Sequence, residues 1–409
     1  MRVVLSHRIA LVPTAAQEVL LRQAVGVSRF AFNWALAEWQ RQYRNGEKPS
    51  AGALKKQWNA IQYARYPWLK DVHRDAHAQP FTNLGRAFQA FFQNIKDRKA
   101  KKTTGTVGYP TFKKKGVHDS FSMANDKVQV DGKHLRIPIL GWVRMREALR
   151  FTGKLMAAVV SRTADRWYVS LSVQVHPLPP SGENQAGRVG VDLGIRHLAT
   201  LSTPREHIDG PKPLRGALQK LRRGNRQLAR RVKFSANWHK TKRKLGRLHA
   251  RIAAIRTDGL HKLTTRLAQT YQQIVLEDLH VQGLVQNRKL ARAISDMGLG
   301  MFRRLLTYKA EVSGAQIIVA DRWFPSSKLC LACGSLHEML TLADRVFVCP
   351  ACGFTDDRDF HVADNLEAYP RLVGNDNACG QPGAGLPEGV GETELVEAGT
   401  TESALLRTF

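Results

Sequence analysis

Acidic residues are scarce in this sequence. Lys and Arg number 63 against 34 Asp and Glu, which gives a formal net charge of +29 at pH 7. Charge of one sign repels itself and does not serve fold stability. The excess therefore predicts a polyanionic partner, and nucleic acid is the first candidate. Hydrophobic residues make up 43% of the chain, so we expect folded domains and not a disordered basic tail.

Cysteine and long apolar runs are also rare. Five cysteines in 409 residues argue against a disulfide scaffold and fit a reducing cytoplasm. No stretch approaches the roughly 20 apolar residues of a membrane helix. The N-terminal segment MRVVLSHRIALVPT lacks the apolar core and cleavage site of a signal peptide. We therefore expect a cytoplasmic protein of two or three domains with no membrane partner.

Four of the five cysteines lie in one passage. Cys330 and Cys333 form one C-x2-C pair, and Cys349 and Cys352 form a second after fifteen intervening residues. Two thiolates three positions apart grip one ion from a tight turn, and two such pairs complete a tetrahedron. Because four thiolates leave no open position for a substrate, we expect one structural Zn²⁺. Cys379, the fifth cysteine, is interpreted as an incidental free thiol.

Carboxylates stand at the ends of three elements predicted for the C-terminal half. The first strand of the passage 188–202 reaches Asp192, the strand 271–279 ends in Glu277 and Asp278, and Asp359 follows the second cysteine pair. An α/β nuclease core of the RNase H type requires a strand hairpin, a helical segment, a second strand and an acidic residue later in the chain.

These acids predict a site for two divalent ions. Hydrolysis of a phosphodiester needs charge compensation at the attacking water and at the leaving oxygen, and two Mg²⁺ roughly 3.5–4 Å apart provide it. Hard oxygen ligands select Mg²⁺ or Mn²⁺ over zinc. We expect Asp192 to bridge both ions, and Glu277 and Asp359 each to complete one. Spacing alone does not explain why three neighbouring acids would be left out, namely Asp278, Asp356 and Asp357.

The N-terminal part alternates between strand and helix patterns. Residues 3–11 read as a strand, Thr14 and Gln17 form a capping box before a helical stretch, and period-two alternation between 118 and 176 indicates antiparallel strands. We therefore predict a small β-barrel or sheet of residues 1–13 and 118–180, with a helical lobe of residues 14–117 inserted in it. Residues 176–187 have the composition of a linker, and residues 371–409 that of a disordered acidic tail.

Two regions carry more positive charge than a solvated surface needs. One is the lysine run after GYPTF, and the other is a helical pair between Lys212 and Lys262 in which the only acid is Asp258. Nucleic-acid contact is the better interpretation of both. The residues expected to make it are Lys113, Lys114, Lys115, Arg222, Arg223, Arg230, Arg231, Lys242, Arg243 and Lys244. Three more could steady phosphate or the metals, with surface roles equally open: Arg288, Arg292 and Asp296.

The motifs VGVDLGI, IVLEDL, PSSKLCLACG, CPACG and DRDFHVADNL, with GYPTFKKK nearer the start, resemble those of the TnpB (OrfB) proteins of bacterial insertion sequences, over about residues 5 to 370. The resemblance implies a RuvC-like nuclease, related to type V CRISPR effectors. Such a protein takes a guide RNA from the transposon's own end and cuts double-stranded DNA beside a short target-adjacent motif. By position, the resemblance makes Asp192, Glu277 and Asp359 the catalytic acids and assigns zinc to the four cysteines.

The expected architecture is multidomain α+β. An N-terminal β-barrel (wedge) holds the inserted helical recognition lobe, residues 188–324 and 356–370 form the RNase H-like (RuvC) domain, and residues 325–355 form its zinc-ribbon insert. The resemblance implies that the wedge and lobe grip the guide RNA and read the adjacent motif. Gln79, Ser122 and Asn125 are guesses for the reading residues. A monomer is favoured, acting at the nucleoid of a bacterial cell.

One position departs from the family's pattern. The family usually has Asn two residues after the last catalytic Asp, where this chain has His361, while Asn365 is kept. Histidine is bulkier and titrates near neutrality, so we predict reduced or pH-sensitive activity, and not a dead site. Three other functions stay open: a nuclease-impaired RNA-guided DNA-binding repressor, an accessory transposase, and a structural RNA binder in which Asp192→Ala would change nothing.

Overall fold

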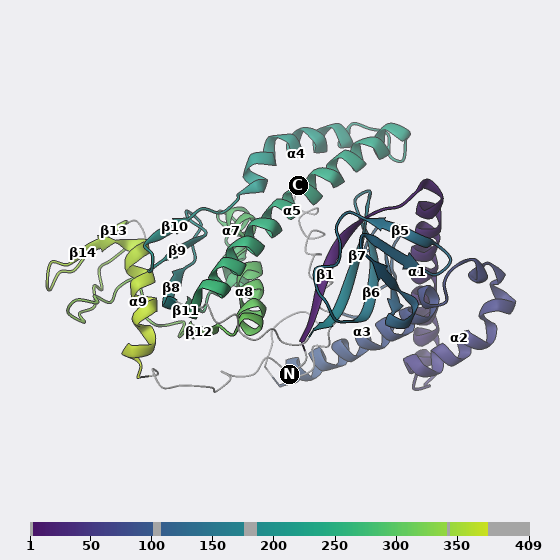
Figure 1. The fold of residues 1–409 in the computed structure, drawn as a ribbon, viewed down its shortest axis with the longest axis horizontal. Coiled ribbons are helices and arrows are strands. Elements are labelled where there is room, and N and C mark those ends of the chain that lie inside the picture. Colours follow the sequence, from purple (N-terminus) through teal and green to yellow (C-terminus); the bar gives the residue numbers. More distant parts are fainter. Residues whose placement is uncertain (1–2, 101–107, 176–185, 342–343, 375–409) are drawn as a thin grey trace. The chain divides into compact units, whose positions relative to one another are not determined.

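The computed structural model describes residues 3–100, 108–175, 186–341 and 344–374 (Figure 1). The chain divides into two compact units between His176 and Pro177, and each is described by itself. Both mix helices and strands, as predicted. Most of the expected linker (176–185) and of the expected tail (375–409, with Cys379) lies outside the described residues. In the part described, no helix has the length and apolar character needed to cross a membrane.

The first unit is built on a seven-stranded antiparallel sheet of order β2-β6-β7-β1-β5-β4-β3. Strand β1 (Val3–Val12) lies inside it, between β7 (Arg166–Val175) and β5 (Gly141–Met145). In β7, alternate side chains such as Trp167 and Val169 are buried. The remaining strands are β2 (Ser120–Ala124), β3 (Gln129–Asp131), β4 (His134–Ile137) and β6 (Lys154–Thr163).

This sheet is not the predicted closed barrel. Its edge strands are β2 and β3, and no pairing joins them among the described residues. Residues 125–128 are the whole connection between these edges, and a segment of that length spans at most about 18 Å, whereas seven flat strands would set the edges about 29 Å apart. The sheet must therefore curl until its edges approach. A barrel also needs the edges to pair, and here the connection forms the short helix η2 (Asn125–Lys127).

The helices that follow β1 share a core with this sheet. Helix α1 (Ala15–Arg44) begins at the predicted capping box, in which the side chains of Thr14 and Gln17 each accept from the other residue's backbone amide. Helices α2 (Ala51–Arg65), η1 (Pro67–Asp71) and α3 (Asp75–Lys99) come next. Buried residues of the helices, such as Leu36 and Phe81, form one cluster with residues of the sheet, such as Ile9. Helices and strands are therefore stabilised together.

The second unit is built on a five-stranded sheet of order β10-β9-β8-β11-β12. Strands β8 (Ala186–Asp192), β11 (Tyr271–Glu277) and β12 (Gln316–Ala320) are parallel, while β9 (Ala199–Leu201) and β10 (Glu206–Ile208) continue antiparallel from β8. Both faces of β11 are covered. Ile274 and Leu276 pack in the cluster of α5 and α8, and Val275 packs in the cluster of α9. This burial explains the continuous apolar run of β11.

The helices of the second unit lie on both faces of its sheet (Figure 1). Helix α9 (Arg358–Leu372) crosses β8 at Gly190, where an added methyl group would collide with the carbonyl oxygen of Ala363, so glycine is required there. The others are α4 (Pro213–Ala229), α5 (Ala236–Thr270), α6 (Val281–Gln286), α7 (Ala291–Met297) and α8 (Leu299–Ser313). Helices α4 and α5 are the predicted basic pair. Strands β13 (Val346–Val348) and β14 (Thr355–Asp357) form a small hairpin within the cysteine-rich passage.

Candidate functional site

Two of the predicted acids lie at the ends of neighbouring parallel strands. Asp192 is the last residue of β8, and Glu277 is the last residue of β11. The residues just before them, Val191 and Leu276, are register partners, so the two acids come side by side at the carboxyl edge of the sheet. Asp359 lies in the first turn of α9, the helix that crosses β8. Three elements thus bring the three predicted acids together.

The three carboxylates are close enough to repel one another. The pKa of Asp192 is raised to about 8, first by burial and then by the carboxylates of Glu277 and Asp359, while the guanidinium of Arg358 acts in the opposite direction. At neutral pH the Asp192 carboxyl would mostly keep its proton unless a cation joined the site. Oxygen ligands with excess negative charge are what a hard divalent cation binds.

The acid beside Glu277 is engaged by two arginines. Asp278 forms ion pairs with Arg303 at 2.7 Å and with Arg322 at 2.6 Å. The hydrogen bond from Arg303 is the largest cause of the lowered pKa of Asp278. The two arginines therefore distinguish Asp278 from Glu277, whereas the positions of the two acids in the sequence could not.

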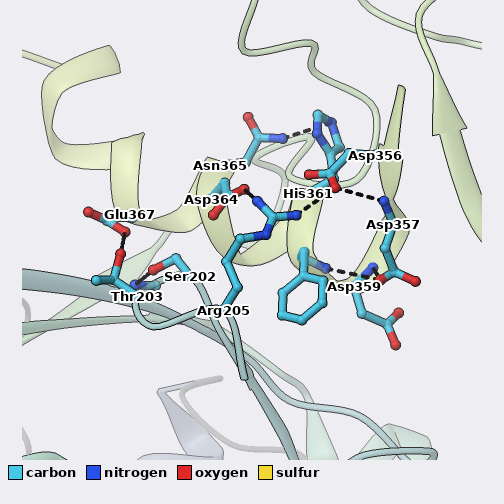
Figure 2. Close-up of polar contacts among 12 residues, drawn as sticks. Ser202, Thr203, Arg205, Asp356, Asp357, Asp359, His361, Asp364, Asn365 and Glu367 are labelled. Carbon is cyan, nitrogen blue, oxygen red and sulfur yellow. Dashed lines mark hydrogen bonds and ion pairs between the residues drawn. The ribbon is translucent and has the colours of Figure 1, made fainter. Parts of the chain in front are cut away.

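The two acids before Asp359 are engaged as well (Figure 2). Asp357 is the N-cap of α9, and its Oδ1 accepts from the backbone amide of Asp359 at 2.9 Å, which orders the turn that carries Asp359. Asp356 pairs with Arg205 at 2.5 Å, and the same guanidinium reaches Asp364 at 2.6 Å. Arg205 lies between β9 and β10, so it ties that hairpin to α9.

Glu277 is held by a residue that sequence reasoning missed. The hydroxyl of Ser326 donates to Glu277 Oε1 at 2.5 Å. Ser326 is buried, and its carbonyl oxygen accepts from Asn365 Nδ2 at 2.8 Å. Asn365 lies on α9 and also donates to the carbonyl of Leu329 at 2.9 Å. Helix α9 therefore positions Glu277 as well as Asp359. The available signal was the PSSK motif, which sets a serine just before the first cysteine pair.

His361 packs against the cysteine-rich passage. Its ring stacks on Phe347 of β13, with centroids 3.8 Å apart and planes 14° from parallel. Its Nε2 lies 2.8 Å from the carbonyl of Leu329 and is therefore assigned as the protonated donor. Burial lowers the pKa of the ring, which favours the uncharged form at neutral pH, against the expected titration near neutrality. An asparagine could keep the hydrogen bond but has no ring to stack.

The four clustered cysteines fit one zinc ion. The sulfur atoms of Cys330, Cys333, Cys349 and Cys352 all lie within 4.8 Å of one another. Two of the separations are 3.7 Å (Cys330 to Cys352) and 3.6 Å (Cys333 to Cys349). Four sulfurs bound tetrahedrally at 2.3 Å would lie roughly 3.8 Å apart. The glycine that follows each pair adopts positive φ, which lets the backbone turn back tightly there.

The basic residues predicted to contact nucleic acid are exposed in all cases but one. Lys113 is half-buried, its backbone amide and carbonyl are bonded by the side chain of Asn33, and its ammonium lies 4.5 Å from the ring centre of Phe32. The exposed residues are Lys114, Lys115, Arg222, Arg223, Arg230, Arg231, Lys242, Arg243 and Lys244. Their contact with nucleic acid stays a prediction.

Two of the guessed motif readers lie on elements that pack together. Gln79 is on α3 and Ser122 is on β2, and both are half-buried. The carboxylate of Asp75 joins these elements by accepting from the amide of Ala124 at 2.8 Å. Asn125 begins η2, and its side chain lies outside the part that the structure describes. The reading role stays a prediction.

Asp296 has a structural role. It is 4% exposed, and its two carboxylate oxygens accept from the backbone amides of Leu214 and Arg215, each at 2.9 Å. These amides belong to the first turn of α4, so Asp296 caps that helix from α7. The other two residues suggested with it, Arg288 and Arg292, are exposed.

Three family models match the chain. Residues 169–288 match a model described as "Probable transposase", and residues 300–366 match "Cas12f1-like, TNB domain". Residues 1–48 match a model described as "Helix-turn-helix domain", although residues 3–44 form one strand followed by one long helix.

Several known proteins are similar over most of their length. A "Putative RNA-guided DNA endonuclease" of Mycobacterium tuberculosis H37Rv is 34% identical, over 94% of this chain and 91% of that protein. The "Putative RNA-guided DNA endonuclease InsQ" of Escherichia coli K12 is 32% identical, over 94% and 96%. Among solved structures, the "mini-RNA-guided endonuclease CRISPR-Cas_phi3" is 10% identical, over 91% of this chain and 92% of that one, with a TM-score of 0.44.

Proposed function

Because the chain belongs to the TnpB (OrfB) family of transposon-encoded proteins, we propose that it is an RNA-guided endonuclease that hydrolyses DNA with two divalent metal ions. The observation that carries the proposal is the convergence of Asp192, Glu277 and Asp359, in which burial and mutual repulsion raise the pKa of Asp192 to about 8. Relatives named as RNA-guided DNA endonucleases, similar over nine-tenths of the chain, support the choice of substrate.

The second unit contains the nuclease core of the RNase H (RuvC) type. A hairpin continues antiparallel from β8. Strands β11 and β12 come after helical segments and run parallel to β8. The acids stand at the end of β8, at the end of β11 and in the first turn of α9. We assign residues 188–324 and 356–370 to this core and residues 325–355 to the zinc ribbon inserted in it.

Asp192, Glu277 and Asp359 would hold the divalent ions. When bound, two Mg²⁺ activate the attacking water and stabilise the leaving oxygen. The hydrogen bond from Ser326 orients Glu277, and the cap formed by Asp357 orders the turn of Asp359.

The partners are a guide RNA and a double-stranded DNA target. The exposed basic face of α4 and α5 supplies phosphate contacts. The first unit holds the guide RNA and reads a short motif beside the target, with its wedge in residues 1–13 and 118–180 and its recognition helices in 14–117. Base pairing supplies the choice of sequence. A monomer suffices for this scheme, because one chain carries all three acids.

The test begins with sequencing the RNA that copurifies with the protein. A plasmid that carries a match to this RNA beside varied flanking sequences is then incubated with the complex and Mg²⁺. We expect Mg²⁺-dependent cleavage that is lost in Asp192→Ala, with DNA binding retained. Binding without cleavage by the parent protein would identify a repressor, and joined strands would identify a transposase. An Asp192→Ala variant as active as the parent would refute the proposed site.

A further inference from the structure

An exposed tryptophan follows β12 at the edge of the sheet where Glu277 lies. Strands β11 and β12 are parallel and Glu277 pairs with Ala320, so the residues after Ala320 emerge at the edge where Glu277 lies. Trp323 follows three positions later and is 85% exposed, more than any other large apolar side chain in the described part. Single exposed apolar residues are ordinary. A whole indole left in water beside a proposed nuclease site suggests a contact made with substrate.

The backbone around Trp323 is anchored although its ring is exposed. Its amide donates to Asp321 Oδ1 at 2.8 Å. The ring of Phe324 packs edge-on against Tyr369 of α9, with centroids 4.8 Å apart. On the other side, Arg322 is ion-paired at 2.6 Å to the acid that follows β11. A ring presented from an anchored backbone loses less conformational entropy when a ligand covers it than one on a loose loop.

A cavity lies between the segments that follow β11 and β12. Its volume is about 420 Å³, within the 300–1,000 Å³ usual for sites that hold small molecules. Residues on either side of Trp323 line it, together with the proposed metal ligand Glu277. The lining residues are Glu277, Asp278, Leu279, His280, Gly283, Leu284, Ala320, Asp321, Arg322, Phe324 and Ser326.

We propose that Trp323 stacks on an unpaired base of the DNA strand being cut, while the adjoining sugar-phosphate enters the cavity beside Glu277. This inference rests on the proposed function. Bases inside a duplex already stack on each other, so only an unpaired base offers its face to a side chain. The cut DNA strand, and not the guide RNA, occupies the cavity, because the nucleotide that lies beside Glu277 during the reaction is joined to the phosphate under attack.

The first experiment locates the contact. Guide-loaded protein is bound to its DNA target with Ca²⁺ replacing Mg²⁺ to limit cleavage, and 5-iododeoxyuridine replaces one nucleotide at a time on either strand around the cut. After irradiation, peptide mapping should find Trp323 crosslinked from one or two adjacent positions beside the cut. A crosslink from iodouridine placed in the guide RNA, with none from the DNA, would overturn the inference.

The second experiment measures the contribution of stacking to cleavage. Trp323→Ala should raise the half-saturating DNA concentration by roughly 5- to 150-fold, the range for loss of one base–aromatic stack, and Trp323→Phe should restore most of it. Met339→Ala is the control, because Met339 is 83% exposed in the ribbon and should leave the value unchanged. If the parent cuts DNA and Trp323→Ala reaches half-saturation at the same DNA concentration as the parent, the stacking role is refuted. Failure of the parent to cut refutes the proposed function itself.

Discussion

Contacts from distant residues decide which of two adjacent acids is available to bind a metal. Asp278 is paired with two arginines and Asp357 caps α9, while Glu277 accepts a short hydrogen bond from Ser326. A hydroxyl donor orients a carboxylate without neutralising its charge. Asp278 is already compensated by its two arginines, which leaves Glu277 as the acid of this pair that is available to a divalent ion.

Removal of the Ser326 hydroxyl should weaken metal binding. Residues that orient metal ligands typically change metal affinity or activity by about 10- to 100-fold, so Ser326→Ala should raise the half-saturating Mg²⁺ concentration for cleavage within that range. Ser327→Ala is the matched control, since no contact joins that neighbouring hydroxyl to the acids in the described part. Equal Mg²⁺ requirements in the parent and Ser326→Ala would contradict the orienting role.

Replacement of His361 by the family's asparagine should change stability and not pH dependence. The buried ring stays uncharged at neutral pH, so cleavage by His361→Asn should follow the parent's profile between about pH 6.5 and 8.5. Loss of the stack on Phe347 should lower the unfolding free energy by about 1 kcal/mol, measured by thermal or denaturant melting. A pH–activity profile that shifts with the substitution would support the prediction that His361 titrates near neutrality.

His77 should make the first unit sensitive to acid. It is 1% exposed and accepts from Trp58 Nε1, and burial is the main cause that lowers its pKa from 6.5 to about 4. Below pH 6.5 this histidine binds a proton in the unfolded chain but not in the folded chain. The unfolding free energy therefore falls by about 2 kcal/mol between pH 7 and pH 5. His77→Gln keeps an acceptor and cannot titrate.

Denaturant melts of the parent and His77→Gln at the two pH values test this expectation. The variant should lose less stability on acidification, by the amount assigned to the histidine. Equal losses in the two proteins would show that other groups dominate the acid response.

At the scale of elements, α4 is attached to its neighbours through its first turn. Asp296 on α7 caps the first turn of α4, and Arg256 on α5 donates to the same carboxylate at 3.3 Å. One buried side chain thus joins three helices, including both members of the basic pair. The orientation of that pair on the second unit depends on this contact as well as on the apolar residues that pack between α4 and α5.

Asp296→Ala should destabilise the second unit by roughly 2–4 kcal/mol, because it leaves two amides without their acceptor and removes the carboxylate paired with Arg256 Nη2. Asp258→Ala is the matched control. Asp258 forms an exposed pair with Lys262 on α5, and its loss should cost less than about 0.5 kcal/mol. Denaturant melts compare the two variants, and similar losses would refute the capping role.

At the scale of the whole molecule, the net charge of +29 makes affinity for nucleic acid dependent on salt. Each phosphate contact contributes about 0.9 to the slope of log affinity against log salt concentration. Joint replacement of Lys242, Arg243 and Lys244 by alanine should therefore make the slope for DNA shallower by up to about 3. Lys262→Ala, which removes an already paired lysine, should change it little. An unchanged slope in the triple variant would exclude α5 from the interface.

The sequence by itself determined the features that depend on short-range chemistry. The spacing of the cysteines predicted a four-sulfur cluster that the structure contains, and the capping box at Thr14 was found as expected. Asp192 and the pair Glu277 and Asp278 were expected where apolar strands end, and β8 and β11 end at Asp192 and Glu277. In each case, residues within a few positions of one another carry the whole signal.

Only the tertiary structure decided the features that depend on partners far apart in the chain. Arg205 reaches Asp356, Ser326 reaches Glu277, and Asn365 reaches Ser326. The open edges of the first sheet and the stacking of His361 on the ribbon are of the same kind. Side-chain partners and sheet closure depend on how distant segments pack, and local periodicity carries no information about that packing.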